Sequence, residues 1–228
     1  MSLNNKETPA FLLAGGRPRD EEQMTRLLSR AFSAIKSPQV AYIGVANGDS
    51  LPFFEMMEFS LMNAGAKQVD LVPLAQADVN VEAVKQTLQS ADVIFLAGGD
   101  VDVGMDWLNQ HQLTGFLKDL FQGGKLFAGV SAGTIMMGSH WVKWAVKGDD
   151  TTAELFDCLG FTPRLFDVHG EVEDWSDLKV ALRLMGNGAR GYAIPHGGLI
   201  TADSSGTLTN LEKTYFVYLN DDGQITLV

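Results

Sequence analysis

The sequence predicts an α/β protein with a mostly parallel, doubly wound sheet and an antiparallel edge near its C-terminus. In the first two-thirds of the 228 residues, short apolar runs alternate with amphipathic stretches, as strands alternate with helices. In the last third, the apolar runs become short and are separated by turn residues, which is typical of antiparallel strands. We therefore expect one domain that covers residues 1–228.

The alternating part contains five apolar runs of strand length and four helical patterns. The predicted strands are residues 10–14, 40–45, 69–72, 92–97 and 126–129, and the predicted helices are residues 20–35, 53–64, 81–89 and 106–121. Strands joined by helical crossovers pair in parallel, and parallel sheets bind ligands beyond the carboxyl ends of their strands. We therefore expect Gly15-Gly16, Gly98-Gly99 and Ser131, which all follow predicted strands, to face one crevice.

The last third begins with one more helical pattern and continues with short strands. The predicted helix is residues 174–185, and the predicted strands are residues 191–194, 199–201, 207–209, 215–218 and 225–227. The segments 203–206 and 220–223 are rich in Asp, Ser and Gly, which favour turns. These strands are expected to form an antiparallel edge on the same domain.

Composition excludes several classes of partner. The chain has 28 acidic and 17 basic residues, a net charge of −11, which argues against nucleic acid and anionic membranes as partners. No apolar run approaches the length of a membrane span, and the first residues lack the apolar core of a leader peptide, so a cytoplasmic location is expected. Cys158 is the single cysteine and is expected to be a buried apolar residue. No Cys/His cluster has zinc-site spacing, and no metal or cofactor is expected.

The segment Gly129-Val130-Ser131-Ala132-Gly133 carries the clearest chemical signal. It matches the pattern G-x-S-x-G and lies between an apolar strand and an apolar helical segment. Such a strand-to-helix turn exposes a serine hydroxyl, and the glycines allow close approach of neighbouring chains. The pattern predicts Ser131 as the nucleophile of an acyl-transfer enzyme. The alternative is a structural turn in which Ser131 only caps the helix.

A serine nucleophile needs a base, and the chain has four histidines. His111 falls in a helical pattern and is expected at the surface, and His140 is expected as a packed loop residue. His169 and His196 each follow an apolar run of strand length, so both can face the crevice of Ser131. Either histidine could instead be structural.

Backbone N–H groups are expected to stabilise the negative charge that develops during acyl transfer. The N–H of Ala132 is one candidate, and the pair Gly98-Gly99 at the end of a neighbouring strand supplies another. The alternative for Gly98-Gly99 is a plain tight turn. Gly15-Gly16 is not read as a dinucleotide loop, because no third spaced glycine follows.

Taken together, these motifs resemble peptidase family S51, the dipeptidase E and cyanophycinase group, over about the whole chain. The segments that carry the resemblance are residues 97–100, 129–133, 156–169 and 191–197. It implies a fold like that of class I glutamine amidotransferases, which is flavodoxin-like, and a serine peptidase with a Ser-His-Glu triad. In this chain it assigns the serine to Ser131 and the histidine to His169.

The chain departs from the family pattern at three positions. His196 stands where the family has the triad glutamate, Asp100 replaces the usual asparagine, and Gly170 stands where an aromatic residue is common. Three outcomes remain open for the triad. Ser131, His169 and His196 form a weaker triad, a nearby acid substitutes, or hydrolysis is lost and the pocket only binds. The acids considered are Asp149, Asp150, Glu171 and Glu173.

Two hypotheses follow for function. In the first, the protein is a serine peptidase for small peptides, with Ser131, His169 and His196 as the catalytic residues. The N–H groups at Gly98-Gly99 and Ala132 then form the oxyanion hole, and Asp100 contacts the substrate. In the second, it is a catalytically silent binding or regulatory domain on the same fold. A homodimer is an open alternative for the oligomeric state.

Overall fold

A seven-stranded, mostly parallel sheet forms the centre of the molecule in the computed structural model, which describes residues 8–15 and 21–228. Its strand order is β11-β10-β1-β5-β4-β2-β3. The strands are β1 (Ala10–Leu13), β2 (Gln39–Ile43), β3 (Gln68–Val72), β4 (Val93–Leu96), β5 (Leu126–Val130), β10 (Leu199–Ala202) and β11 (Leu208–Glu212). Strands β1 to β5 are parallel, and β10 and β11 add an antiparallel edge beside β1.

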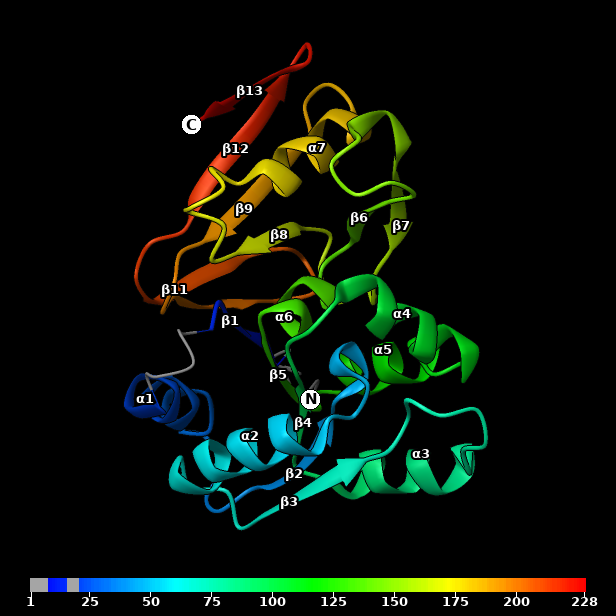
Figure 1. Ribbon diagram of the computed structural model, residues 1–228. Coiled ribbons are helices and arrows are strands. Elements are labelled where there is room, and N and C mark those ends of the chain that lie inside the picture. Colours follow the sequence, from blue (N-terminus) through cyan, green and yellow to red (C-terminus); the bar gives the residue numbers. More distant parts are fainter. Residues whose placement is uncertain (1–7, 16–20) are drawn as a thin grey trace, which may run out of the picture.

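Helices cover both faces of this sheet, as a doubly wound fold requires (Figure 1). The helices are α1 (Glu21–Ala31), α2 (Leu51–Asn63), α3 (Val81–Ser90), α4 (Val101–Gln110), α5 (Thr114–Gln122) and α6 (Ala132–Met136). Along β2, Val40 and Tyr42 pack with α1 and α2, whereas Ala41 and Ile43 pack with the other four helices. Because successive strand residues point to opposite faces and both faces are covered, β2 is apolar without alternation.

A second, four-stranded sheet and one helix lie beside the first sheet and occupy the upper part of Figure 1. Its order is β13-β12-β9-β8, with β8 (Leu165–Val168), β9 (Arg190–Ile194), β12 (Phe216–Asp221) and β13 (Gln224–Leu227). Helix α7 (Ser176–Met185) packs on this sheet, and the ribbon of β6 (His140–Trp144) and β7 (Ala153–Asp157) packs next to α7. One apolar core continues from α4 and α6 into β8, β9 and α7.

The fold class predicted from the sequence is confirmed, and the antiparallel strands of the last third are divided between two sheets. Only β10 and β11 extend the main sheet, whereas the other late strands form the separate sheet. Within that sheet β8 and β9 are parallel, which brings the carboxyl ends at Val168 and Ile194 side by side. The ribbon β6–β7 was not predicted, because its sequence mixes tryptophans and charges without clean alternation.

Three local predictions are wrong. The single helix expected over residues 106–121 is two helices, because the chain turns at Gln112, whose φ is 55°.

His111 is buried rather than at the surface. Its Nε2 lies 2.8 Å from the carbonyl oxygen of Leu74, and its ring stacks on Trp107. His140 begins β6 instead of lying in a loop, and Cys158 is buried as expected. Gly16 lies outside the described residues.

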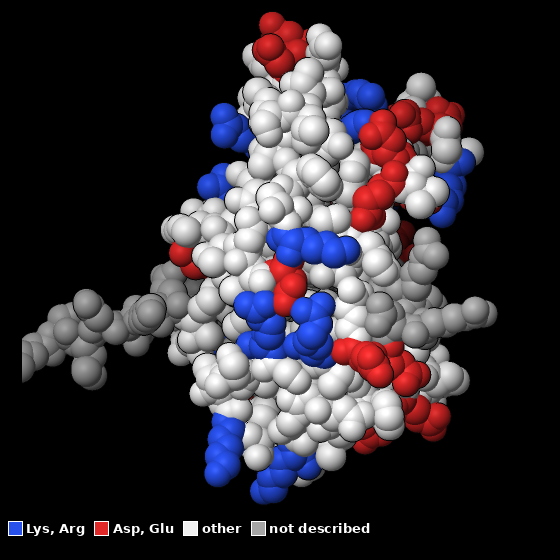
Figure 2. All heavy atoms as spheres, turned by 90° about the vertical axis from the view of Figure 1, so that its left-hand side faces the viewer, with Lys and Arg blue, Asp and Glu red and all other residues white. Residues whose placement is uncertain are grey.

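Charged side chains gather on the side of the molecule formed by α1 and β11. Arg26 and Arg30 of α1 each form an ion pair of 2.6 Å with Glu212 of β11. Figure 2 shows basic side chains around acidic ones near the middle of that face. Among residues 8–15 and 21–228, no helix has the length and apolar character needed to cross a membrane.

Candidate active site

Ser131 lies on a strained turn between β5 and α6. Its φ of 54° and ψ of −120° are unusual for a residue with a side chain. The backbone holds this geometry from both sides. The Ser131 N–H donates to the carbonyl of Leu13 at 3.0 Å, and its carbonyl accepts from the N–H groups of Thr134 and Ile135. Below the turn, the Thr134 hydroxyl bonds the carbonyls of Leu13 and Gly129.

The two glycines of the motif are sterically required. A Cβ on Gly133 would lie 2.1 Å from the carbonyl oxygen of Leu96, and a Cβ on Gly129 would lie 2.7 Å from the backbone of Gly133. Neither position leaves room for any side chain, so the strand, the turn and the helix can pack at this distance only with glycine.

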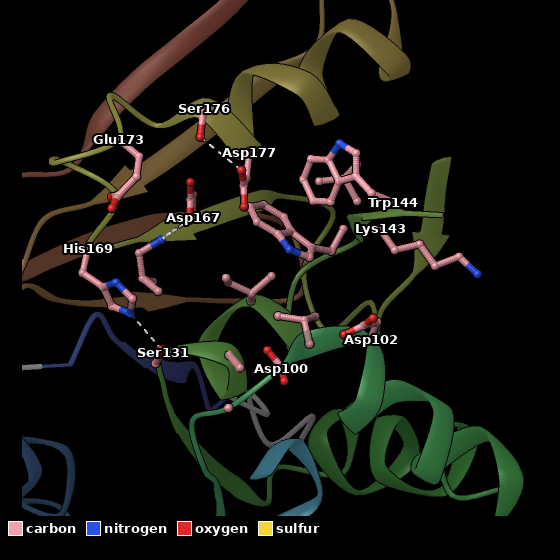
Figure 3. Close-up of a pocket in the computed structure, with 18 of the residues that line it drawn as sticks. Asp100, Asp102, Ser131, Lys143, Trp144, Asp167, His169, Glu173, Ser176 and Asp177 are labelled. Carbon is pink, nitrogen blue, oxygen red and sulfur yellow. Dashed lines mark hydrogen bonds between the residues drawn. The ribbon is translucent and has the colours of Figure 1, made fainter. Parts of the chain in front are cut away.

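The side chain of Ser131 faces His169 instead of capping α6. It makes no capping hydrogen bond, although Ser131 occupies the N-cap position. Its Oγ lies 2.8 Å from Nε2 of His169, which is the length of a good hydrogen bond (Figure 3). His169 directly follows β8 and has a φ of 47°, and its N–H donates to the carbonyl of Ile194 at the end of β9. The second sheet thus brings a histidine to the serine of the first sheet.

His196 comes two residues after the end of β9, beside the end of β8 that leads into His169. The main chain of His196 is held from two sides, since its N–H donates to Glu171 Oε1 at 2.6 Å and its carbonyl accepts from Lys213. The orienting role predicted for His196 therefore stays a prediction. The bond to His196 also occupies one carboxylate oxygen of Glu171.

The other acids considered from the sequence lie in different places. Asp149 caps a short 3₁₀ turn through Thr151, and Asp150 accepts from the Trp144 indole at 3.3 Å, both at the end of the β6–β7 ribbon. Glu173 lines the same cavity as Ser131 and His169. Of the acids considered, Glu173 is the one that shares the cavity with the Ser131–His169 pair.

Two backbone N–H groups are available next to Ser131. Within the part of the chain that the structure describes, the N–H groups of Gly99 and Ala132 donate to no backbone or side-chain acceptor, and both residues line the cavity. Gly98 packs directly on the serine, because a Cβ there would lie 3.2 Å from the Ser131 Cβ. Gly99 has a φ of 145°, and a Cβ on it would overlap the carbonyl of Ala46.

Asn47, which the sequence reasoning missed, fixes the peptide between Gly98 and Gly99. Its Nδ2 donates to the Gly98 carbonyl at 2.8 Å, while its Oδ1 accepts from the N–H of Ser50. The Gly98 carbonyl and the Gly99 N–H belong to one planar peptide, so this bond also fixes the direction of the N–H. An amide residue just after β2, at the carboxyl edge of the sheet, was the signal that could have found it.

The cavity around Ser131 has a volume of about 580 Å³, within the range of pockets that hold small molecules. Its walls come from the start of α4, the turn into α6, the strand β6, the end of β8 and the start of α7. Asp100, the predicted substrate contact, lines it, and the Asp100 side chain makes no capping bond to α4. Among the described residues, no group of three or more His, Cys, Asp or Glu could hold a metal ion.

Asp167, also missed from the sequence, is a buried carboxyl group in this wall. It lies on β8, two residues before His169, and its side chain accepts from the Val168 N–H at 2.7 Å. Its pKa is raised from 3.8 to about 7, mainly by burial and additionally by the nearby charges of Asp177 and Glu171, against the opposing effect of its hydrogen bonds. The protonated form of this carboxyl group is therefore favoured far more than that of an exposed aspartate.

A serine on a sharp strand-to-helix turn, with a histidine in hydrogen-bond contact on a doubly wound sheet, defines a class of α/β hydrolytic proteins. Comparison with models of known protein families places the chain in one of them. Residues 10–203 match the model of peptidase family S51, and the chain belongs to that family. It is thus a member of a peptidase family with a mixed α/β fold.

The similar proteins agree with this assignment. A cyanophycinase from a Nostoc species is 25% identical over 171 residues, which are 68% of this chain and 54% of that protein. The chain therefore spans about half the length of this curated relative. Two solved structures have the same fold, each with a TM-score of 0.68. One is a peptidase from an acI-B1 actinobacterium, at 18% identity over 97% of this chain and 93% of that one. The other is a putative peptidase E protein from Listeria monocytogenes, at 16% identity over 90% and 99%.

Proposed function

We propose that the protein is a cytoplasmic serine peptidase that hydrolyses small peptides at Ser131. The observation that carries this proposal is the hydrogen bond of 2.8 Å between Ser131 Oγ and His169 Nε2, on a turn whose strained backbone is held from both sides. A hydroxyl in contact with an imidazole is the arrangement that activates a serine. The membership of family S51 supports peptide bonds as the target.

The proposed reaction uses the groups in the order that their positions suggest. Ser131 Oγ attacks the carbonyl carbon of the scissile bond while His169 Nε2 accepts its proton. The N–H groups of Gly99 and Ala132 donate to the resulting oxyanion, and Asn47 holds the first of them in direction. His169 then gives the proton to the leaving amine as the C–N bond breaks. Water, deprotonated by His169, hydrolyses the acyl ester and restores Ser131.

The second candidate is a silent binding domain, and His196 in place of the family's glutamate favours it. A histidine can hold the tautomer of His169, but it stabilises the imidazolium poorly. Of the four acids considered above, Glu173 is the one that lines this cavity, and it is our candidate to supply the missing charge.

The two candidates are separated by the hydrolysis of di- and tripeptides by wild type, His196→Glu and His196→Ala. Peptidase function predicts release of amino acids by the wild-type protein, and a fall in rate with His196→Ala if this side chain orients His169. Hydrolysis by His196→Glu alone would establish the silent alternative. Glu173→Gln, assayed in parallel, shows whether that acid has taken over.

A further inference from the structure

The loop that follows β2, residues 44–50, holds the peptide planes on both sides of Gly99. On one side, Asn47 Nδ2 donates to the Gly98 carbonyl at 2.8 Å. On the other side, the N–H that follows Gly99 in the chain donates to the Ala46 carbonyl at 2.7 Å. Because each peptide is planar, these two bonds fix the backbone before and after Gly99. The direction of the Gly99 N–H, a proposed oxyanion donor, therefore depends on where this loop lies.

Asp49, two residues after Asn47, ties the loop to the end of the neighbouring strand β3. Its Oδ2 accepts from the backbone N–H groups of Leu74 and Ala75, each at 2.6 Å. Hydrogen bonds to a carboxylate are stronger than those between neutral groups, so this is a firm attachment. The φ of Asp49 is 53°, a left-handed conformation in which Asp and Asn are enriched among residues with a side chain.

The segment that Asp49 binds is itself held in place. Leu74 is fully buried, and its carbonyl oxygen lies 2.8 Å from Nε2 of the buried His111 at the end of α4. The ring of His111 stacks on Trp107. Leu74 is thus bonded through both its N–H and its carbonyl, and it gives the loop after β2 a fixed point of attachment.

The side chain of Asp49 also folds back over the start of its own loop. A Cβ on Gly44 would lie 3.0 Å from Asp49 Oδ1 and 3.0 Å from a ring carbon of Tyr42, which leaves little room for a side chain there. Tyr42 is fully buried and stacks on Phe95 of β4. The N–H groups of Asn47 and Asp49 both donate to the Gly44 carbonyl, at 2.9 and 3.0 Å. Asn47 and Asp49 therefore belong to one compact turn, and a shift of Asp49 moves Asn47 with it.

We propose that Asp49 is a positioning residue for the oxyanion hole, which fixes the loop 44–50 to the end of β3 and thereby directs the Gly99 N–H. Asp49 is not one of the described residues that line the cavity, so it acts on the reaction only through the loop. This inference rests on the proposed function, because the hole has a role only if Ser131 attacks a carbonyl group. The alternative is an aspartate that contributes to the stability of the fold alone.

The test compares two substitutions of Asp49 with one of a matched aspartate. Asp49→Ala removes both bonds to the end of β3, whereas Asp49→Asn keeps an acceptor oxygen and tolerates the φ of 53°. Asp203, in the turn between β10 and β11, is half-buried like Asp49. Its Oδ1 accepts from the N–H groups of Ser205 and Thr207 at 2.9 and 2.8 Å. Asp203→Ala therefore removes a similar pair of bonds outside the cavity.

Steady-state kinetics with one hydrolysed peptide gives the first readout. We expect Asp49→Ala to lower kcat about 10-fold with KM nearly constant, because a misdirected oxyanion donor acts in the transition state. Asp49→Asn should stay within about 3-fold of wild type, since it keeps an acceptor for the N–H groups. Asp203→Ala should keep the wild-type kcat, even where urea denaturation shows a similar loss of stability.

Hydrogen exchange of backbone amides, followed by NMR, gives a second readout that needs no activity. The amide of Asp100 donates to the Ala46 carbonyl, so its exchange rate reports how firmly the loop holds the backbone after Gly99. We expect this amide to exchange at least about 10-fold faster in Asp49→Ala than in Asp203→Ala, and near the wild-type rate in Asp49→Asn. Should Asp49→Ala not fold, Asp49→Gly takes its place, because glycine adopts a φ of 53° without strain.

A lower kcat together with faster exchange at Asp100, both absent from Asp203→Ala, supports the proposal. Unchanged exchange, an unchanged kcat, a raised KM in place of a lower kcat, or equal effects in Asp203→Ala overturns it. A wild-type protein without peptidase activity sinks the proposed function instead. The exchange measurement then still decides whether Asp49 holds the backbone around Gly99.

Discussion

The cavity around Ser131 has two parts that are held together in different ways. We call the turn from β5 into α6, with the Gly98–Gly99 peptide beside it, the floor, and the part formed by β6, β8 and α7 the wall. On the floor, Ser131 lies between glycines that admit no Cβ, and its backbone bonds join it to β1 and to its own helix. In the wall, Asp167, Trp141 and Trp175 come from three separate elements, and the second sheet and the ribbon bring them together. Close backbone contacts of one turn with β1 and β4 set the floor, whereas the packing of side chains from the second sheet, α7 and the ribbon sets the wall.

This difference matters for how chemistry and selectivity are encoded. The proposed nucleophile and oxyanion donors depend on a backbone geometry that few substitutions can satisfy. Few residue types are therefore compatible with these positions. The charge of the wall depends on side chains whose backbone positions tolerate many residues. Selectivity can therefore change through the wall while the floor stays intact, and the following predictions test that separation.

Removal of the Ser131 hydroxyl should have the largest effect on activity. We expect Ser131→Ala to lower kcat at least about 10⁴-fold with little change in peptide affinity, because the nucleophile is lost and the cavity wall is untouched. Ser50→Ala is the matched control, since Ser50 also precedes a helix without a capping side-chain bond. Steady-state kinetics and equilibrium binding of one peptide would check this, and a kcat within about 10-fold of wild type would contradict it.

The substitution Gly133→Ala, which adds a methyl group to the floor, should destabilise the whole fold. In Gly133→Ala the new Cβ would lie 2.1 Å from the Leu96 carbonyl oxygen, so the turn must move away from β4. We expect a loss of at least about 4 kcal/mol in the free energy of unfolding, measured by urea denaturation. Gly115→Ala in α5 meets no atom within 4 Å and should be neutral or slightly stabilising. Similar stabilities of the two variants would show that the floor is not rigid.

The buried carboxyl group of the wall should make stability depend on pH. The pKa of Asp167 is raised from 3.8 to about 7, so the folded state binds more protons than the unfolded state between these values. The free energy of unfolding therefore falls as pH rises through this window, by at most about 4 kcal/mol from this group.

Asp167→Asn should remove this contribution, so its stability relative to wild type should increase from pH 4.5 to pH 8. Urea denaturation at the two pH values measures the difference, with Asp119→Asn as the control for loss of one carboxylate. The same relative stability of Asp167→Asn at both pH values would argue that Asp167 is not shielded from water.

Loss of the Asn47 hydrogen bond that fixes the peptide between Gly98 and Gly99 should have the smallest of these effects. Asn47→Asp keeps an acceptor for the Ser50 N–H but cannot donate to the Gly98 carbonyl, so the Gly99 N–H is less firmly directed. We expect kcat to fall about 10- to 100-fold with KM nearly constant, since a misdirected oxyanion donor acts in the transition state. A raised KM with unchanged kcat would instead indicate a role in substrate binding.

The sequence predicted the fold class and the strand-to-helix turn at Ser131, for physical reasons. Apolar runs that end in glycine mark strands of a covered parallel sheet, and the glycines around Ser131 are required by contacts between neighbours. It missed the ribbon β6–β7, whose strands lack clean alternation, and the separate second sheet, whose parallel pair β8–β9 joins segments distant in the sequence. For the same reason it did not reveal Asp167, which becomes part of the site only when β8 packs beside β9 and α7.

The most direct test of the central claim is covalent labelling with a fluorophosphonate, followed by mass spectrometry of the labelled residue. The account predicts that Ser131 of the wild-type protein is modified, that Ser131→Ala is not, and that His169→Ala reacts much more slowly because the base is missing. Equal labelling of wild type and Ser131→Ala would contradict the claim that Ser131 is an activated nucleophile.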